Sequence, residues 1–160
     1  MCGIFALLGH HKHNNNDDKT KLIMNSFNKG KKRGPETSTW TANLDYNFSF
    51  GFHRLAINGL DQESDQPINF ENIKLICNGE IFNYHELYSE LNIKPKTNSD
   101  CEIIIHLYKQ YGIEQTLQMI DGEFAFVLFD SDADLMYACR DPYGIRPLYL
   151  YENKSKQIIG

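Results

Sequence analysis

No stretch of this 160-residue sequence is apolar for long enough to span a membrane. Its apolar runs stay far below the roughly 18 residues that a transmembrane helix requires. The N-terminus also lacks the charged-then-apolar pattern of a secretory signal. We therefore expect no membrane span and no membrane partner.

Cysteine is sparse as well. The four cysteines, at positions 2, 77, 101 and 139, form neither a Cys-x-x-Cys pair nor the dense framework of a disulfide-stapled domain. This spacing favours a reducing compartment. We expect a cytoplasmic protein in which Cys77, Cys101 and Cys139 fill the core.

Basic residues and ordered metal ligands are also lacking. The formal net charge is −5, and the one basic cluster, residues 29–33, is better explained as a solvated loop than as a nucleic-acid interface. The three histidines within residues 10–13 lack the spacing of metal ligands. The sequence thus predicts no nucleic-acid partner and no metal site.

Short apolar segments at both ends of the chain, with amphipathic segments between them, are what the sequence does contain. Their patterning predicts strands near residues 4–8, 48–52, 73–77, 124–129, 135–140, 147–151 and 157–160. It predicts helices near residues 17–28, after 83, from 99 to 112 and from 113 to 120. Tight turns imply antiparallel pairing. We expect one α+β domain of two stacked sheets with helices on the outside.

Two helix starts carry capping patterns. Asn83 with Glu86 predicts a cap for the short helix, and Ser99 with Glu102 forms a capping box of the S-x-x-E type. Gly112 is expected to end the helix that begins at Ser99.

The N-terminal residues Met1 and Cys2 suggest chemistry. Removal of Met1 would leave Cys2 with both a thiol and a free α-amine, whose reference pKa of roughly 7.7–8.0 suits a general base. A nucleophile activated by an N-terminal amine follows the same logic. The alternative is that Cys2 is only the second residue of a terminal strand.

Three further groups would complement such a nucleophile. Asn78 and the backbone N–H of Gly79 can stabilise an oxyanion. Arg54 can hold a carboxylate with two hydrogen bonds, and Asp100 can take an ammonium group. A substrate with a carboxamide at one end and an amino acid at the other is glutamine.

Each of these residues also has a structural interpretation. Arg54 suits a surface ion pair, and Asn78-Gly79 is a common turn dipeptide. Asp100 suits the first turn of a helix, where the dipole favours a negative charge.

Several motifs occur in an order that resembles a known family. They are Met1-Cys2-Gly3-Ile4, Arg33-Gly34-Pro35, Gly51-Phe52-His53-Arg54-Leu55-Ala56, Asn78-Gly79-Glu80-Ile81-Phe82-Asn83, Asp121-Gly122-Glu123-Phe124-Ala125-Phe126 and Arg140-Asp141-Pro142-Tyr143-Gly144-Ile145-Arg146-Pro147-Leu148. The chain resembles the class II, N-terminal-nucleophile glutamine amidotransferase domain, and most closely that of glutamine-hydrolysing asparagine synthetases. The resemblance covers nearly all of residues 1–160 and implies a four-layer αββα sandwich.

The resemblance implies a role for each matching residue. Cys2 would be the nucleophile and its α-amine the base, with Asn78 and Gly79 forming the oxyanion hole. Arg54 would bind the α-carboxylate of L-glutamine. The other substrate-binding residues would be Leu55, Ala56, Ile57, Asn58, Asn78, Gly79, Glu80 and Asp100. A Cys2 thioester would form, release ammonia and be hydrolysed to glutamate.

Partners and cofactors are implied in the same way. Ammonia would pass to an ATP-using synthetase domain or subunit that amidates aspartate, and a homodimer is conceivable. No cofactor is expected in residues 1–160, because ATP and Mg²⁺ would belong to the synthetase part, which this sequence does not include.

Departures and alternatives remain. Glu36 stands where the family usually has aspartate, and residues 1–160 are expected to be an amidotransferase domain that is incomplete at its C-terminal end. One alternative is a non-catalytic glutamine-binding or regulatory module. Another is the same chemistry serving a different acceptor, such as phosphoribosylpyrophosphate.

Overall fold

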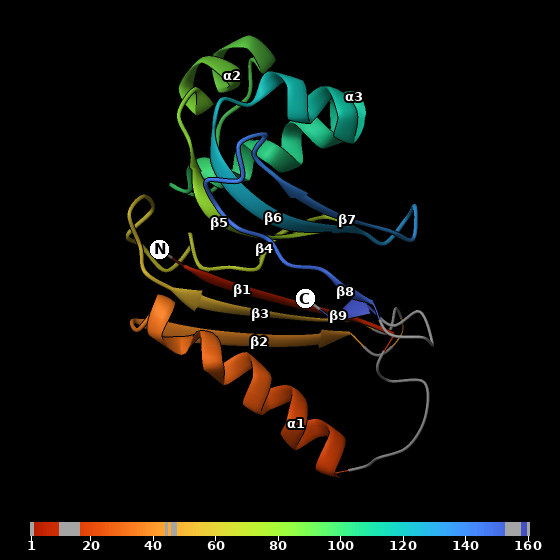
Figure 1. Ribbon diagram of the computed structural model, residues 1–160. Coiled ribbons are helices and arrows are strands. Elements are labelled where there is room, and N and C mark those ends of the chain that lie inside the picture. The colour runs from red at the N-terminus through yellow and green to blue at the C-terminus, as the bar shows by residue number, and fades with distance from the viewer. Residues whose placement is uncertain (1, 10–16, 44, 46–47, 153–157, 160) are drawn as a thin grey trace.

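Two antiparallel sheets stack face to face in the computed structural model (Figure 1), which describes residues 2–9, 17–43, 45, 48–152 and 158–159. The first sheet has the order β2-β3-β1-β9-β8 and the second the order β4-β5-β6-β7. The strands of the first sheet are β1 (Gly3–Leu8), β2 (Thr37–Asn43), β3 (Phe48–Arg54), β8 (Tyr151–Glu152) and β9 (Ile158–Ile159). Those of the second are β4 (Ile68–Phe70), β5 (Ile73–Ile81), β6 (Gly122–Asp130) and β7 (Leu135–Arg140).

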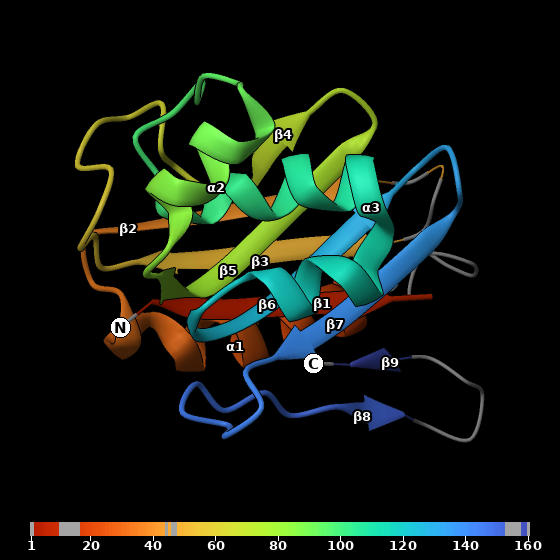
Figure 2. The ribbon, with the colours of Figure 1, turned by 90° about the horizontal axis from the view of Figure 1, so that it is seen from above.

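Helices cover the two outer faces. Helix α1 (Asp17–Asn28), followed by the 3₁₀ helix η1 (Lys29–Arg33), lies on the outer side of the first sheet. Helices α2 (Tyr84–Leu91) and α3 (Ile103–Met119) lie over the second sheet, as Figures 1 and 2 show, and a short 3₁₀ helix, η2 (Asp100–Glu102), precedes α3. The expected α+β sandwich with the layer order αββα is confirmed.

Two apolar clusters hold these layers together. Between the sheets, Phe48, Phe50 and Phe52 of β3 face Val127 and Phe129 of β6. The larger cluster lies between the second sheet and its helices, and it includes Leu75, Phe124, Phe126, Leu128, Ile103, Ile104 and Leu107. The unbroken apolar run in β6 follows from this arrangement, because a central strand with a covered face on each side has no solvent-facing positions.

The expectation that a strand ends near Cys77 was wrong. Strand β5 continues through Asn78 and Gly79 to Ile81, and Gly79 pairs with Phe124 of β6. A Cβ on Gly79 would lie 2.4 Å from the Glu123 carbonyl oxygen, so the close approach of these strands requires glycine. Asn78-Gly79 is therefore not a turn.

Other boundaries also differ from expectation. The structure has strands β2 and β4 where the pattern predicted none, and residues 147–150 are not a strand. The break at Gly112 was predicted correctly: within α3 this residue is non-helical, with φ 78° and ψ 174°, a conformation that glycine adopts readily, and a second helical segment follows it.

The two capping predictions met different outcomes. The Asn83 side chain caps no helix; its amide bridges the Met119 carbonyl and the Asp121 N–H, at 2.9 Å each. Ser99 does cap η2, because its hydroxyl accepts from Cys101 N–H. Glu102, however, binds elsewhere.

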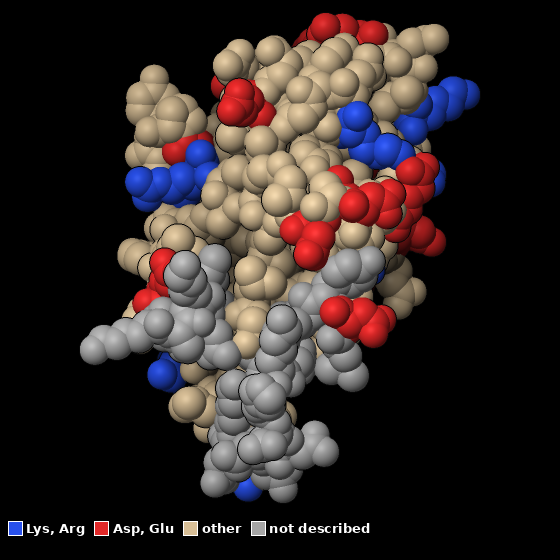
Figure 3. All heavy atoms as spheres, turned by 90° about the vertical axis from the view of Figure 1, so that its right-hand side faces the viewer, with Lys and Arg blue, Asp and Glu red and all other residues tan. Residues whose placement is uncertain are grey.

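Among the residues that the structure describes, no helix is long and apolar enough to cross a membrane. On the face shown in Figure 3, acidic and basic side chains are interspersed, and the described basic residues form no continuous patch there. The histidine-rich segment at residues 10–13 lies outside the described residues.

Candidate active site

A cavity of about 40 Å³ opens where β1, β3 and β5 come together. Most of the residues singled out from the sequence line it: Cys2, Arg54, Leu55, Ala56, Ile57, Asn58, Asn78, Gly79 and Asp100. Glu80 is absent from the lining. It follows Gly79 on β5, close enough that its charge helps to raise the pKa of the Asp100 carboxyl.

The register of the first sheet places Cys2 at this cavity. Gly3 pairs with His53, so Cys2 lies level with the end of β3. Gly34 makes this end of the sheet compact, because a Cβ there would lie 2.1 Å from the His53 carbonyl oxygen. The Arg33 Nε donates to the Cys2 carbonyl at 3.2 Å. The motif Arg33-Gly34 thus fixes the backbone that carries the thiol.

The Cys2 thiol faces the backbone of Leu55. Its Sγ donates to the Leu55 carbonyl oxygen at 3.3 Å, and the Leu55 N–H points to the same sulfur at 3.4 Å. Burial raises the pKa of the thiol, while the backbone hydrogen bond with Leu55 lowers it in part. A base beside the thiol is therefore needed to generate the thiolate.

Asn78 presents an uncommitted amide to the site. The residue is 5% exposed and lines the cavity, yet none of the described residues makes a hydrogen bond with its side chain. A buried amide costs free energy unless it finds a partner. The arrangement therefore suits an oxygen atom that arrives with a ligand.

Asp100 is a carboxylate at the opposite wall, and it is 3% exposed. Burial raises its pKa, although a 2.7 Å hydrogen bond from the Ile81 N–H and one from the Asn58 side chain act in the other direction. None of the described residues pairs a positive charge with it. Asp100 therefore suits a cationic group of a ligand.

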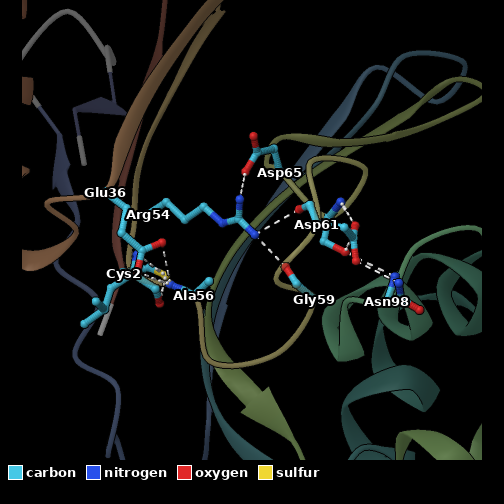
Figure 4. A network of polar contacts seen from close by, with 10 residues as sticks. Cys2, Glu36, Arg54, Ala56, Gly59, Asp61, Asp65 and Asn98 are labelled. Atoms are coloured by element: carbon cyan, nitrogen blue, oxygen red, sulfur yellow. Dashed lines mark hydrogen bonds and ion pairs between the residues drawn. The ribbon is translucent and has the colours of Figure 1, made fainter.

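Arg54 extends along the loop that follows β3 (Figure 4). Its Nη2 donates to the carbonyl oxygens of Gly59 and Asp61 at 2.5 and 3.0 Å, and its Nη1 lies 2.6 Å from Asp65 Oδ1. The side chain is 11% exposed. The structural interpretation of Arg54 as an ion-pair residue thus holds alongside its place on the cavity wall.

Comparison with known proteins identifies the family. The sequence matches the family described as "Glutamine amidotransferase domain" over residues 1–159.

The chain belongs to this family of glutamine amidotransferase domains.

Several relatives of this chain are named as asparagine synthetases. The amidotransferase domain is 36% identical over its whole length to the "Probable asparagine synthetase [glutamine-hydrolyzing]" of Acanthamoeba polyphaga mimivirus, and covers 29% of that protein. It is 40% and 41% identical, over 93% of its length, to "Asparagine synthetase [glutamine-hydrolyzing]" of Gallus gallus and Bos taurus, and covers 26% of each. The chain thus spans less than a third of the relatives that it matches.

Glu36 contacts the backbone that follows β3 in this amidotransferase domain. Both carboxylate oxygens accept from Ala56 N–H, at 3.3 and 3.2 Å, and the Glu36 N–H donates to the Arg54 carbonyl oxygen. Glu36 therefore fixes the backbone of the cavity wall (Figure 4).

Glu102, interpreted from the sequence only as part of a capping box, holds the segment that leads to Asp100. Glu102, 1% exposed, accepts from the N–H groups of Lys96 and Thr97 at 2.8 and 2.6 Å and contacts His106 Nε2 at 2.9 Å. Burial alone would raise the pKa of Glu102, but these hydrogen bonds lower it to about 2. The charged carboxylate thus anchors the loop that leads to Asp100.

A second fixing point joins two loops across the cavity. The Asp61 carboxylate accepts from the Ser64 hydroxyl at 2.8 Å and from Asn98 Nδ2 at 2.7 Å, and the Ser64 hydroxyl accepts from Asn98 N–H at 3.1 Å. Because the Asp61 carbonyl also holds Arg54, this contact links the Arg54 wall to the segment before Asp100 (Figure 4). Asn98 lies more than 30 residues from both Asp61 and Ser64, so local sequence patterns do not predict these contacts.

The turn at residues 141–146 also serves the cavity. Asp141, 1% exposed, accepts from the backbone N–H groups of Phe124, Tyr143, Ile145 and Arg146. These hydrogen bonds bring Arg146 to the cavity wall, where it forms an ion pair with Glu123. Arg146 was not among the site residues expected from the sequence.

A larger, mostly apolar cavity of about 400 Å³ reaches Cys2 from the other side. It shares Cys2 and Asn78 with the small cavity and extends between the sheets to Val127, Met136 and Leu148. Within the described part of the chain, no group of three or more His, Cys, Asp or Glu side chains is arranged to hold a metal ion.

Proposed function

We propose that this amidotransferase domain hydrolyses L-glutamine to glutamate and ammonia through a thioester on Cys2. One observation carries the proposal. The Cys2 thiol, the Asn78 amide and the Asp100 carboxylate line a single small cavity, and among the described residues Asn78 has no side-chain hydrogen bond and Asp100 has no positively charged partner. These groups complement the carboxamide and the ammonium group of glutamine, and the glutamine-hydrolysing relatives support the assignment.

Binding would use the two charged ends of the amino acid. Arg54 takes the α-carboxylate, and the backbone from Leu55 to Asn58 lines the side-chain path. Asp100, together with the nearby charge of Glu80, takes the α-ammonium group. The carboxamide then lies toward Cys2, because the charged residues leave only that end of the cavity for a neutral group.

The first chemical step is attack by sulfur on the amide carbon. With Met1 removed, the α-amine of Cys2 accepts the thiol proton, and the new S–C bond converts the carbonyl oxygen to an oxyanion. The Asn78 amide and the Gly79 N–H stabilise that charge. The C–N bond then breaks, and the proton held by the amine goes to the leaving nitrogen, so that ammonia departs and a γ-glutamyl thioester remains.

Water completes the cycle. The α-amine removes a proton from water, whose oxygen attacks the thioester carbon. The C–S bond breaks, glutamate forms, and the sulfur regains its proton. The overall reaction consumes one glutamine and one water and needs no cofactor in residues 1–160.

The fate of the ammonia follows from the relatives. Because they are named asparagine synthetases and are more than three times as long as this chain, we propose that the ammonia supplies an ATP-using synthetase domain or subunit that amidates aspartate. ATP and Mg²⁺ would bind there. A homodimer and a cytoplasmic location remain part of this proposal.

The test combines intact mass with a glutamate-release assay. The purified protein is expected to lack Met1 and to release glutamate and ammonia from glutamine. Cys2→Ala abolishes release, whereas Cys139→Ala, a cysteine outside the cavity, retains it. Glutamine binding without turnover in the trimmed protein would refute hydrolysis and support the binding-module alternative. Co-purification with a phosphoribosylpyrophosphate-using enzyme, and with no synthetase, would refute the proposed acceptor.

A further inference from the structure

Asp65 pairs with the guanidinium group that the proposed function assigns to the substrate carboxylate. Its Oδ1 lies 2.6 Å from Nη1 of Arg54. Asp65 belongs to the loop between β3 and β4, and its side chain is 34% exposed, whereas that of Arg54 is 11% exposed. Asp65 is thus the more exposed member of the pair, although the carboxylate oxygen that faces Arg54 is itself buried.

The other donors of Arg54 leave little room for a second carboxylate. A guanidinium group has five N–H donors, and the two on Nη2 are used by the carbonyl oxygens of Gly59 and Asp61. Two parallel hydrogen bonds to a carboxylate require one N–H of Nη2 together with Nε or Nη1, so no such pair is free, and an incoming carboxylate is left with the N–H groups of Nη1 and Nε. Nη1 is the atom that Asp65 already contacts.

Apart from Arg54, no described residue makes a polar contact with the Asp65 carboxylate. Figure 4 shows it beside one terminal nitrogen of the guanidinium group, while Gly59 and Asp61 contact the other. Its backbone N–H closes a turn onto the Gln62 carbonyl oxygen, which any side chain at this position would preserve. Among the described residues, its side chain makes no further polar contact.

We infer that Asp65 is an affinity-determining residue whose carboxylate competes with the α-carboxylate of the substrate for Arg54. The inference rests on the proposed function. Asp65 keeps the guanidinium group paired, and an amino acid must displace it to bind. Asp65 thereby weakens the binding of glutamine and, equally, of the product glutamate. Asp65 acts on binding, before the chemical step. It therefore changes KM but not kcat, which depends on the groups around Cys2.

The expected size of the effect follows from the strength of such a pair. In a partly exposed ion pair, the paired form is only a few times more populated than the separated form. The apparent affinity for the ligand is the intrinsic affinity multiplied by the fraction of molecules in which the pair is separated. Replacing Asp65 by asparagine is therefore expected to lower the KM for glutamine by about two- to sixfold. A merely structural role, in which Asp65 holds Arg54 in place, requires the opposite sign.

The experiment compares Asp65→Asn with Asp132→Asn in the trimmed protein. Asp132 is an exposed aspartate in the turn between β6 and β7, so its replacement changes the net charge equally without touching the site. For Asp65→Asn we expect a lower KM for glutamine, a lower inhibition constant for glutamate and an unchanged kcat. The inhibition constant of 4-aminobutanamide, which is glutamine without its α-carboxylate, is expected not to fall. Asp132→Asn is expected to match the unsubstituted protein.

Two results would overturn the inference, and they differ from failure of the proposed function. An unchanged or raised KM in a variant that retains the unsubstituted melting temperature and kcat means that Asp65 supports Arg54 or is idle. A fall in the inhibition constant of 4-aminobutanamide equal to that of glutamate means that the effect does not act on the carboxylate. Absence of glutamine turnover in the trimmed, unsubstituted protein refutes the proposed function itself.

Discussion

Replacing Glu102 by glutamine tests whether a buried charge holds the Asp100 wall of the cavity. Glutamine has nearly the same shape but carries no charge, and its single amide oxygen can accept from only one of the two N–H groups, Lys96 or Thr97, that the Glu102 carboxylate binds with different oxygens. Hydrogen bonds to an ionised carboxylate are stronger than those to a neutral amide, and Glu102 is 1% exposed. The variant therefore removes the charge with little change in packing.

The magnitude follows from the lowered pKa. The difference between the ordinary value of 4.5 and about 2 in the folded protein corresponds to about 3 kcal/mol of stabilisation at neutral pH. Because the folded pKa lies below the unfolded one, this stabilisation is fully present above about pH 4.5 and is lost as the pH falls toward 2. At pH 3.5, roughly 2 kcal/mol of it remains.

The assay is urea unfolding at pH 7 and at pH 3.5. Glu102→Gln is expected to lower the free energy of unfolding by about 3 kcal/mol at pH 7 and by about 2 kcal/mol at pH 3.5. Glu90→Gln, an exposed residue of α2, is the matched control and is expected to change little at either pH. A loss that does not shrink on acidification, or no loss at all, would refute the charge-anchor argument.

Three further predictions concern the cavity wall. Asn78→Ala is expected to reduce kcat for glutamine hydrolysis by about 10²–10³ with the fold intact, as loss of one oxyanion donor does; steady-state kinetics with a melting curve decides this. Gly79→Ala forces β5 away from β6, so its free energy of unfolding, measured in urea, should fall by about 1–3 kcal/mol, and a wild-type midpoint would contradict the close approach. Glu36→Asp withdraws the carboxylate from Ala56 N–H and is expected to raise KM severalfold more than it lowers kcat; an unchanged KM would show that the wall does not need this contact.

The layers of the fold were predictable because they depend on local periodicity. The alternating phenylalanines of β3 place one face against the second sheet, and the unbroken apolar run of β6 requires cover on both faces. Turn residues between β6 and β7 fixed an antiparallel pairing. These signals act over a few residues, so a single sequence contains them in full.

The strand that carries Asn78 was not predictable in the same way. An Asn-Gly dipeptide usually signals a turn, and only the neighbouring strand shows why it continues here. Gly79 faces Phe124, more than 40 residues away, at a distance that admits no side chain. For the same reason the contact between Asp61 and Asn98 was not predictable, since the two residues come from different loops.

The candidate residues were predictable as a set, but their present partners were not. Chemistry suggested a nucleophile, an oxyanion donor and two charged receptors, and all of these residues but Glu80 line one cavity. The two charged receptors differ in their partners. Arg54 is already paired with Asp65, whereas none of the described residues pairs a positive charge with Asp100.

This asymmetry has a consequence for the order of recognition. Burying Asp100 without a counter-ion is costly, and the raised pKa of its carboxyl expresses that cost. An incoming α-ammonium group supplies the missing charge at once, while the α-carboxylate has to displace an existing partner. The amino end of glutamine should therefore contribute most of the initial binding free energy, and the Arg54 contact should form afterwards, as the loop that carries Asp65 releases it.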